Sequence, residues 1–258
     1  MFDAYLMVDW SARAKPAPPY PTKDAIWYCL RQGEKEEVVY CRTREEAEEQ
    51  IGAHLAKLNG RVLVGFDFSL AYPEWAMEKL GGWKALWRLL EAAPLFTTDR
   101  FEVAALLNKK LTGGAAPFWG CPYVLPEVPQ KKPQPYEWQE FRTTEQKLKA
   151  LKRNPRSGFQ LFGNGSVGSQ TLTGIPVLER LRRRFGNDLS VWPFEAPARI
   201  VIAEVWPSLL SEAQLPAHTI HDARQVLGLA RALKGVTLPE TPEVAKCEGW
   251  ILPPRTVD

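Results

Sequence analysis

Two short apolar runs that each end on an aspartate constrain the fold of this 258-residue chain most strongly. The first run, residues 5–8, precedes Asp9, and the second, residues 62–66, precedes Asp67. Short apolar runs rich in β-branched residues and bounded by turn signals predict buried strands. A carboxylate in such a strand is costly to bury unless a cation or hydrogen bonds receive it. The two aspartates together therefore favour an acidic metal-binding site at one edge of a sheet. The alternative for each aspartate is that its side chain caps the turn that follows the strand.

The composition is that of a globular protein, with 45% hydrophobic and 24% charged residues. The length allows one large α/β domain or two small ones. No stretch approaches the roughly 18 consecutive apolar residues that span a bilayer, and Asp3 precedes every basic residue, unlike in a signal peptide. Four cysteines without a CxxC pair and only three histidines argue against structural zinc and for a reducing compartment. We expect a cytoplasmic protein without a membrane partner.

The formal net charge of +3 conceals an uneven distribution of charge. Residues 131–184 contain twelve Lys or Arg against four Glu, an excess of eight, so the rest of the chain is net acidic. A basic block of this kind is a candidate for phosphate contacts. A solvated, partly disordered insertion is the alternative.

The first third of the chain predicts three strands followed by a helix and a fourth strand. The strands lie at about residues 4–9, 25–30 and 37–41, and we expect them to form an antiparallel meander. A proline-rich loop at residues 13–22 separates the first two strands.

Thr43 and Glu46 have the spacing of a capping box and predict the start of the helix, which ends near residues 59–60. The strand ending at Asp67 follows directly. A strand–helix–strand passage normally places the two strands parallel through a right-handed crossover. If the fourth strand lies beside the first, Asp9 and Asp67 emerge at the same edge of the sheet.

The remaining chain predicts mainly helices. Helical spacing extends over residues 73–111 and 140–153, and a proline-rich irregular connection separates them at residues 117–136. Residues 199–205 predict a last strand, and residues 222–233 predict a closing helix.

Residues 161–170 form a glycine-rich loop. Such a loop can point successive backbone N–H groups at an anion. It lacks the Gly-Lys-Ser/Thr sequence of a P-loop and the spacing of a dinucleotide-binding fingerprint. The alternative is a tight structural turn before a helix at residues 175–184.

Three strands, a helix, a strand, and later a strand and a closing helix follow the element order of the ribonuclease-H-like fold. Acids fall on the first strand (Asp9), the fourth strand (Asp67), the last strand (Glu204) and the last helix (Asp222). The chain resembles the uncharacterised, predicted-nuclease branch of that superfamily. Its members show a short strand ending in Asp, a Gly-hydrophobic-Asp-hydrophobic fourth strand and a Glu-hydrophobic-x-Pro segment. The matching segments here are residues 8–9, 65–70 and 204–207.

The resemblance covers about residues 1–75 and 195–235. It implies an α/β fold in which a mixed sheet, a three-strand antiparallel meander plus parallel strands, is flanked by helices. The expected organisation is a single ribonuclease-H-like domain over residues 1–258 with a large helical and irregular insertion at about 75–190.

The resemblance also implies a nuclease that hydrolyses phosphodiesters with two Mg²⁺ or Mn²⁺ ions, which prefer hard oxygen ligands. Asp9 would bridge the ions, Asp67 and Asp222 would flank them, and Glu204 would be a fourth ligand or orient the water. The first helix offers no clear acid to the site, so the third metal ligand is open. His221 would help to move a proton or would be a plain surface residue.

Nucleic acid is the implied partner, bound through its phosphates without reading of sequence. The residues expected to contact phosphates are Lys147, Lys149, Lys152, Arg153, Gly163, Gly165, Ser166, Gly168, Arg182, Arg183 and Arg184.

Two other functions stay open. Actin-like ATPases and sugar kinases share this fold and use a first-strand aspartate with Mg²⁺, but they carry a glycine just after it that residues 10–12 lack. The glycine-rich loop keeps a nucleotide-binding protein of this type open. The third hypothesis is a non-catalytic binding protein whose acids persist only as caps.

Overall fold

The computed structural model describes residues 1–93, 99–163 and 165–253, which form two compact units. The first unit, called the sheet unit, contains Met1–Asp67, Leu181–Thr241 and the segment that begins at Trp250. The second, called the helical unit, contains Phe68–Arg180 and Pro242–Gly249. No helix among the described residues is long and apolar enough to cross a membrane.

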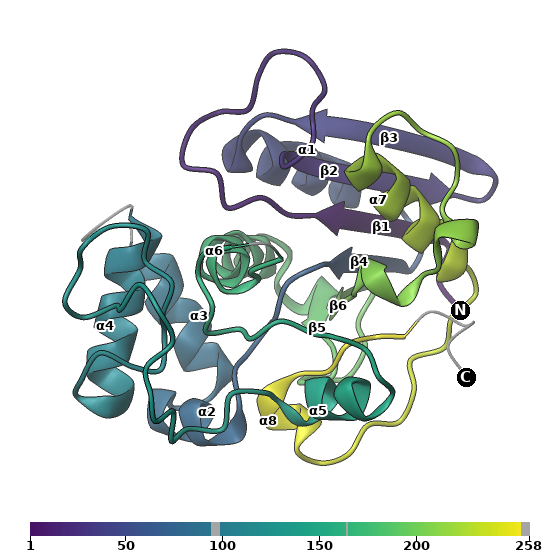
Figure 1. Cartoon of the computed structure of the whole chain (residues 1–258). Coiled ribbons are helices and arrows are strands. Elements are labelled where there is room, and N and C mark those ends of the chain that lie inside the picture. The colour runs from purple at the N-terminus through teal and green to yellow at the C-terminus, as the bar shows by residue number, and fades with distance from the viewer. Residues whose placement is uncertain (94–98, 164, 254–258) are drawn as a thin grey trace. The chain divides into compact units, whose positions relative to one another are not determined.

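The sheet unit is built on a six-stranded mixed sheet, which confirms the predicted α/β class and the antiparallel meander joined to parallel strands (Figure 1). The sheet order is β3-β2-β1-β4-β6-β5. β1 pairs antiparallel with β2 and β2 with β3, whereas the pairs β1–β4, β4–β6 and β6–β5 are parallel. The strands are β1 (Ala4–Asp9), β2 (Ile26–Gln32), β3 (Lys35–Cys41), β4 (Val62–Phe66), β5 (Leu189–Val191) and β6 (Ile200–Glu204). The three-residue β5 was not predicted, because so short a segment carries no period.

Thr43 is the N-cap of α1 (Arg44–Lys57), as the sequence predicts, and its hydroxyl accepts a hydrogen bond from the Glu46 N–H at 3.1 Å. The Glu46 carboxylate accepts one from the Arg42 N–H at 2.8 Å, one residue before the N–H that would complete the predicted capping box. The helix carries the chain from β3 at one edge of the sheet to β4, which pairs with β1 in the middle. This crossover makes β1 and β4 parallel neighbours whose carboxyl ends lie together.

Helices cover both faces of the sheet. α7 (His221–Ala232) packs on one face, where its apolar side chains share a buried core with Tyr5, Met7 and Leu63. α1 lies on the other face, because the Tyr28 hydroxyl, on the opposite side of its strand from that core, donates to the Gln50 side chain of α1 at 3.0 Å. Figure 1 shows α7 and α1 on either side of the first strands.

Gly65 allows the central strands to pack closely on the α7 face. A Cβ atom at this position would lie 2.6 Å from the Met7 sulfur and 2.8 Å from a Val205 methyl carbon. Both distances are too short for any real Cβ contact. Glycine at position 65 therefore leaves room for the side chains of Met7 and Val205, which a larger residue would displace.

The helical unit confirms helices within residues 73–93, 99–111 and 140–153 and the irregular chain between the last two ranges; residues 94–98 of the prediction lie outside the described residues. Tyr72, Phe118 and Phe159 form the centre of its aromatic core, with ring centroids 5.1–5.3 Å apart. Its helices are α2 (Glu74–Leu80), α3 (Trp83–Ala92), α4 (Arg100–Thr112), α5 (Thr143–Ala150) and α8 (Ala245–Glu248), together with most of α6 (Gly168–Phe185). The sequence did not predict α8, and the predicted start of α6 is seven residues too late. Gly168 and Pro176 are the reason for the late start, because both residue types usually break helices.

A buried ionic network holds the helical unit together. Arg142, 1% exposed, donates to Glu145 at 2.7 Å and to the Glu248 backbone carbonyl at 3.1 Å. The Glu248 carboxylate, also 1% exposed, accepts the N–H groups of Glu74 at 2.9 Å and Thr143 at 2.7 Å. These are the first residues of α2 and α5, so one carboxylate caps two helices.

Candidate active site: carboxylates at the end of the sheet

Three predicted acids converge in the sheet unit. Asp9 is the last residue of β1, and Asp67 directly follows β4, its parallel neighbour. Asp222 lies in the first turn of α7, the helix that covers the same face of the sheet. Because parallel strands end at the same edge, the crossover through α1 brings the first two acids together, and the packing of α7 adds the third.

Backbone N–H groups orient two of these carboxylates. The Trp10 N–H donates to Asp67 at 2.8 Å, and the Asp24 N–H donates to Asp222 at 2.7 Å. The side chains of Asp9 and Asp67 also interact with each other directly, and this interaction contributes to the raised pKa of Asp9.

Burial and mutual repulsion raise the pKa of all three acids. Burial raises the pKa of Asp9 well above its ordinary value, and the charges of Asp67, Asp222 and Asp24 raise it further. Burial also raises the pKa of Asp67 from 3.8 to about 7, against the opposing effect of the Trp10 N–H. The pKa of Asp222 is likewise raised, mainly by burial. Such a cluster of perturbed acids is typical of a functional site.

Asp24 is a fourth acid at this site that sequence reasoning missed. It lies two residues before β2, and its exposed side chain contributes to the raised pKa of Asp9. Its backbone has a positive φ of 57°, a conformation that aspartate tolerates better than most residues. The signal was present in the sequence, because an antiparallel meander brings the start of β2 beside the end of β1.

The structure does not bring Glu204 into this cluster. Its neighbours Ala203 and Val205 face the α7 core, so strand alternation directs Glu204 to the opposite face of the sheet. Glu204 is only 4% exposed, and the carboxylates whose charges raise the pKa of Asp9 are Asp67, Asp222 and Asp24. Glu204 ends the last strand, as the sequence pattern predicts. Its position in the sheet is one residue out of phase with Asp67, so the two side chains lie on opposite faces.

His221 is exposed at the start of α7, and its charge lowers the pKa of its neighbour Asp222. In residues 1–93, 99–163 and 165–253, no three His, Cys, Asp or Glu side chains stand close enough together to hold a metal ion. Asp9, Asp67 and Asp222 therefore influence one another's pKa without forming a ready-made metal site among the described residues.

Most of the predicted phosphate-binding residues lie in the helical unit. Lys147 and Lys149 are exposed on α5, where the Lys149 ammonium lies 3.7 Å from the centre of the Phe141 ring. Lys152 and Arg153 are exposed just after that helix. Arg182 and Arg183 instead belong to the sheet unit, in the last turns of α6.

The glycine-rich loop uses its backbone N–H groups internally. The Ser166 N–H donates to the Gly163 carbonyl at 3.1 Å, and the Gly168 N–H donates to the Gln160 carbonyl at 3.0 Å. Gly165 is exposed and has a positive φ of 70°. The bonds made by Ser166 and Gly168 favour the structural alternative, a tight turn that leads into α6, over a phosphate cradle.

Comparison of the chain with protein-family models, with curated proteins and with solved structures found no match to any of the three.

Proposed function

We propose that the sheet unit is a divalent-cation-dependent phosphodiester hydrolase of the ribonuclease-H-like type, acting on nucleic acid. The observation that carries the proposal is the convergence of Asp9, Asp67 and Asp222 from three separate elements. The sheet order, with three antiparallel strands followed by parallel β4 and β6, supports the fold assignment that the sequence resemblance implies.

The chemistry of these side chains fits Mg²⁺ or Mn²⁺. The cluster offers only carboxylate oxygens, the ligands that these hard cations prefer. Burial and the neighbouring carboxylates raise the pKa of Asp9, and burial raises that of Asp67, so a bound cation would favour the ionised form of both. Asp9 and Asp67 would hold the cation, with Asp222 completing the set. Bound cations would activate a water molecule and stabilise the leaving oxygen of the phosphodiester.

The chain's own residues contribute orientation of the ligands. The Trp10 N–H holds Asp67, and the Asp24 N–H holds Asp222, so neither carboxylate must reorganise during the reaction. The raised pKa of Asp67 belongs to the cation-free protein, and a bound cation would keep this carboxylate ionised. Asp24 takes the fourth acidic position that the sequence assigned to Glu204.

The nucleotide-binding alternative has less support than the hydrolase. It depended on the glycine-rich loop, whose Ser166 and Gly168 N–H groups donate within the loop. The segment after Asp9 also lacks the glycine that such proteins use around phosphates.

The test is cleavage of end-labelled RNA and DNA, single- and double-stranded, with Mn²⁺, with Mg²⁺ or with EDTA. We expect cation-dependent cleavage of at least one polymer and a loss of about 100-fold or more in Asp67→Asn. Glu49→Gln is the matched control, because it removes an exposed carboxylate from α1 without touching the cluster. Absence of cleavage with either cation, or equal rates in Asp67→Asn and wild type, would contradict the proposal.

A further inference from the structure

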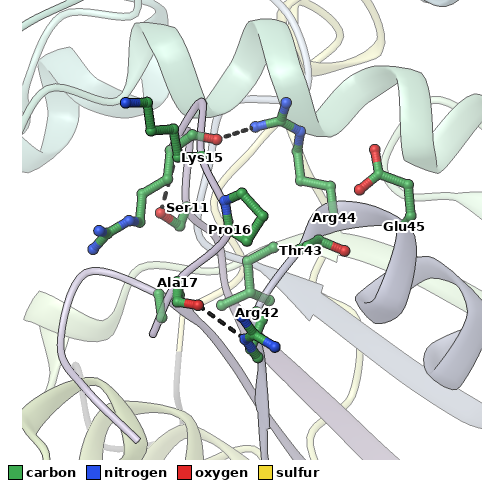
Figure 2. A pocket seen from close by; sticks show the side chains of 11 residues that line it. Ser11, Lys15, Pro16, Ala17, Arg42, Thr43, Arg44 and Glu45 are labelled. Carbon is green, nitrogen blue, oxygen red and sulfur yellow. Dashed lines mark hydrogen bonds between the residues drawn. The ribbon is translucent and has the colours of Figure 1, made fainter. Parts of the chain in front are cut away.

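A pocket with a cationic lining opens between the loop that follows β1 and the start of α1 (Figure 2). Its volume is about 90 Å³. We call it the basic pocket. Its charged lining residues are Arg13, Lys15, Arg42, Arg44 and Glu45.

The lining carries four cationic side chains against one carboxylate. In the part of the chain that the structure describes, the side chains of Arg13 and Lys15 have no recorded hydrogen-bond or ion-pair acceptor. Cations gathered in one concavity repel one another and attract an anion from solution. The electrostatics of the pocket therefore favour a negatively charged ligand.

Hydrogen bonds hold the pocket in shape without a ligand. Arg42 Nε donates to the Ala17 carbonyl at 2.9 Å, and the Ala17 N–H donates back to the Arg42 carbonyl at 2.9 Å. Arg44 donates to the Arg13 carbonyl at 2.7 Å (Figure 2). An arginine has five N–H donors, so Arg42 keeps donors beyond Nε for an anion. This preorganisation lowers the entropic cost of binding.

The size of the pocket selects a small anionic group. Sites for drug-sized ligands measure about 300–1,000 Å³, several times the volume found here. A base and sugar do not fit in such a space, whereas a phosphate group does. Guanidinium groups also match phosphate oxygens in geometry and charge.

The basic pocket adjoins the carboxylate cluster. Ser11 lines the pocket and lies two residues after Asp9, a backbone distance of at most about 7 Å. The Ser11 hydroxyl donates to the Asp24 carbonyl at 2.9 Å, and the Asp24 N–H donates to Asp222. Residues 11 and 24 thus connect the two sites within the sheet unit.

We propose that the basic pocket binds a phosphate group of the substrate other than the one that is cleaved. This inference rests on the proposed hydrolase function and names its substrate as a strand with several phosphates. Each strand of a DNA duplex carries one phosphate per ~3.4 Å of helix axis. The pocket would hold a phosphate one or two nucleotides from the cleaved bond while the cleaved one lies at the carboxylates.

The experiment measures binding without turnover. Fluorescein-labelled single-stranded 12-nucleotide DNA and RNA are titrated with protein in EDTA, and anisotropy is followed over a salt series. In Arg13→Gln/Lys15→Gln we expect binding at least about tenfold weaker and a salt slope smaller by about 1.4, from two lost contacts at about 0.7 each. The control is Lys35→Gln/Lys57→Gln, which removes the same charge from exposed positions on β3 and α1.

Three outcomes would overturn the inference: no binding by wild type, undiminished binding by the pocket variant, or equal loss in the control. Unlabelled oligonucleotide and ADP are added as competitors. Stronger competition by the oligonucleotide supports a strand phosphate, whereas stronger competition by ADP overturns that assignment. Thermal midpoints within about 2 °C verify that the variants are folded. Binding in EDTA without cleavage in Mn²⁺ would refute the hydrolase and leave the pocket standing.

Discussion

The substitution Asp67→Asn should stabilise the cation-free protein at alkaline pH. The folded-state pKa of Asp67 is about 7, above its ordinary value of 3.8. Between pH 3.8 and about 7, Asp67 is therefore protonated in the folded state and ionised in the unfolded chain. The stability that Asp67 contributes is fully present below about pH 4 and is lost as pH rises through 7. Asparagine has no charge to bury, and its amide can keep the bonds to Trp10 and Asp9.

The magnitude follows from the size of the pKa change. A rise from 3.8 to about 7 corresponds to about 4 kcal/mol, at about 1.36 kcal/mol for each pKa unit. Asp67 is only partly buried, and its ionisation depends on that of Asp9, so solvent screening and coupling reduce this upper limit. We expect Asp67→Asn to raise the free energy of unfolding by about 1–2 kcal/mol at pH 8, and by less at pH 5.

Urea denaturation in EDTA at pH 5 and pH 8 measures this effect, with Glu49→Gln as the control for loss of one exposed carboxylate. A second series with millimolar Mn²⁺ should reverse the order, because only wild type gains stability from a bound cation. The reasoning is refuted if Asp67→Asn is less stable than wild type at pH 8, or if its advantage does not change with pH.

Three further predictions test the site and the fold. Asp222→Asn should lower cation-dependent cleavage about 100-fold, whereas Glu204→Gln should change it only a few-fold; single-turnover rates on one labelled strand separate the two. Gly65→Ala should lower the free energy of unfolding by about 1–3 kcal/mol in urea through overpacking, whereas Gly114→Ala, with nothing closer than 3.8 Å to the new methyl, should be near neutral. Glu248→Ala removes the acceptor of two partly buried helix N–H groups and should cost about 1–3 kcal/mol, with faster amide exchange at the starts of α2 and α5. Unchanged exchange there would exclude its capping role.

Much of the sheet unit is predictable from local sequence. The apolar runs before Asp9 and Asp67 are short and rich in β-branched residues, and both became buried strands. The N-cap at Thr43 started α1, and the strand–helix–strand order implied that β1 and β4 are parallel. Each of these signals depends on residues a few positions apart, so no distant contact was needed to interpret it.

The composition of the site was less predictable. Asp24 has no local motif, and it joined the cluster only because the meander returns the chain beside the end of β1. The basic pocket combines residues 11–17 with residues 42–45, which meet because β3 ends next to the loop after β1. The glycine-rich loop resembled an anion site in sequence, but the partners of its N–H groups depend on how the loop folds.

Local sequence patterns predict most of the strands and helices, although not β5 and α8, and they place acids at the ends of three strands. Which of those acids meet depends on how the strands pair and on the face to which each side chain points. β4 and β6 pair with Phe66 opposite Glu204, so Asp67 and Glu204 differ by one position in register. Side chains alternate between faces with a period of two, so that single position sends Asp67 towards α7 and Glu204 away from it.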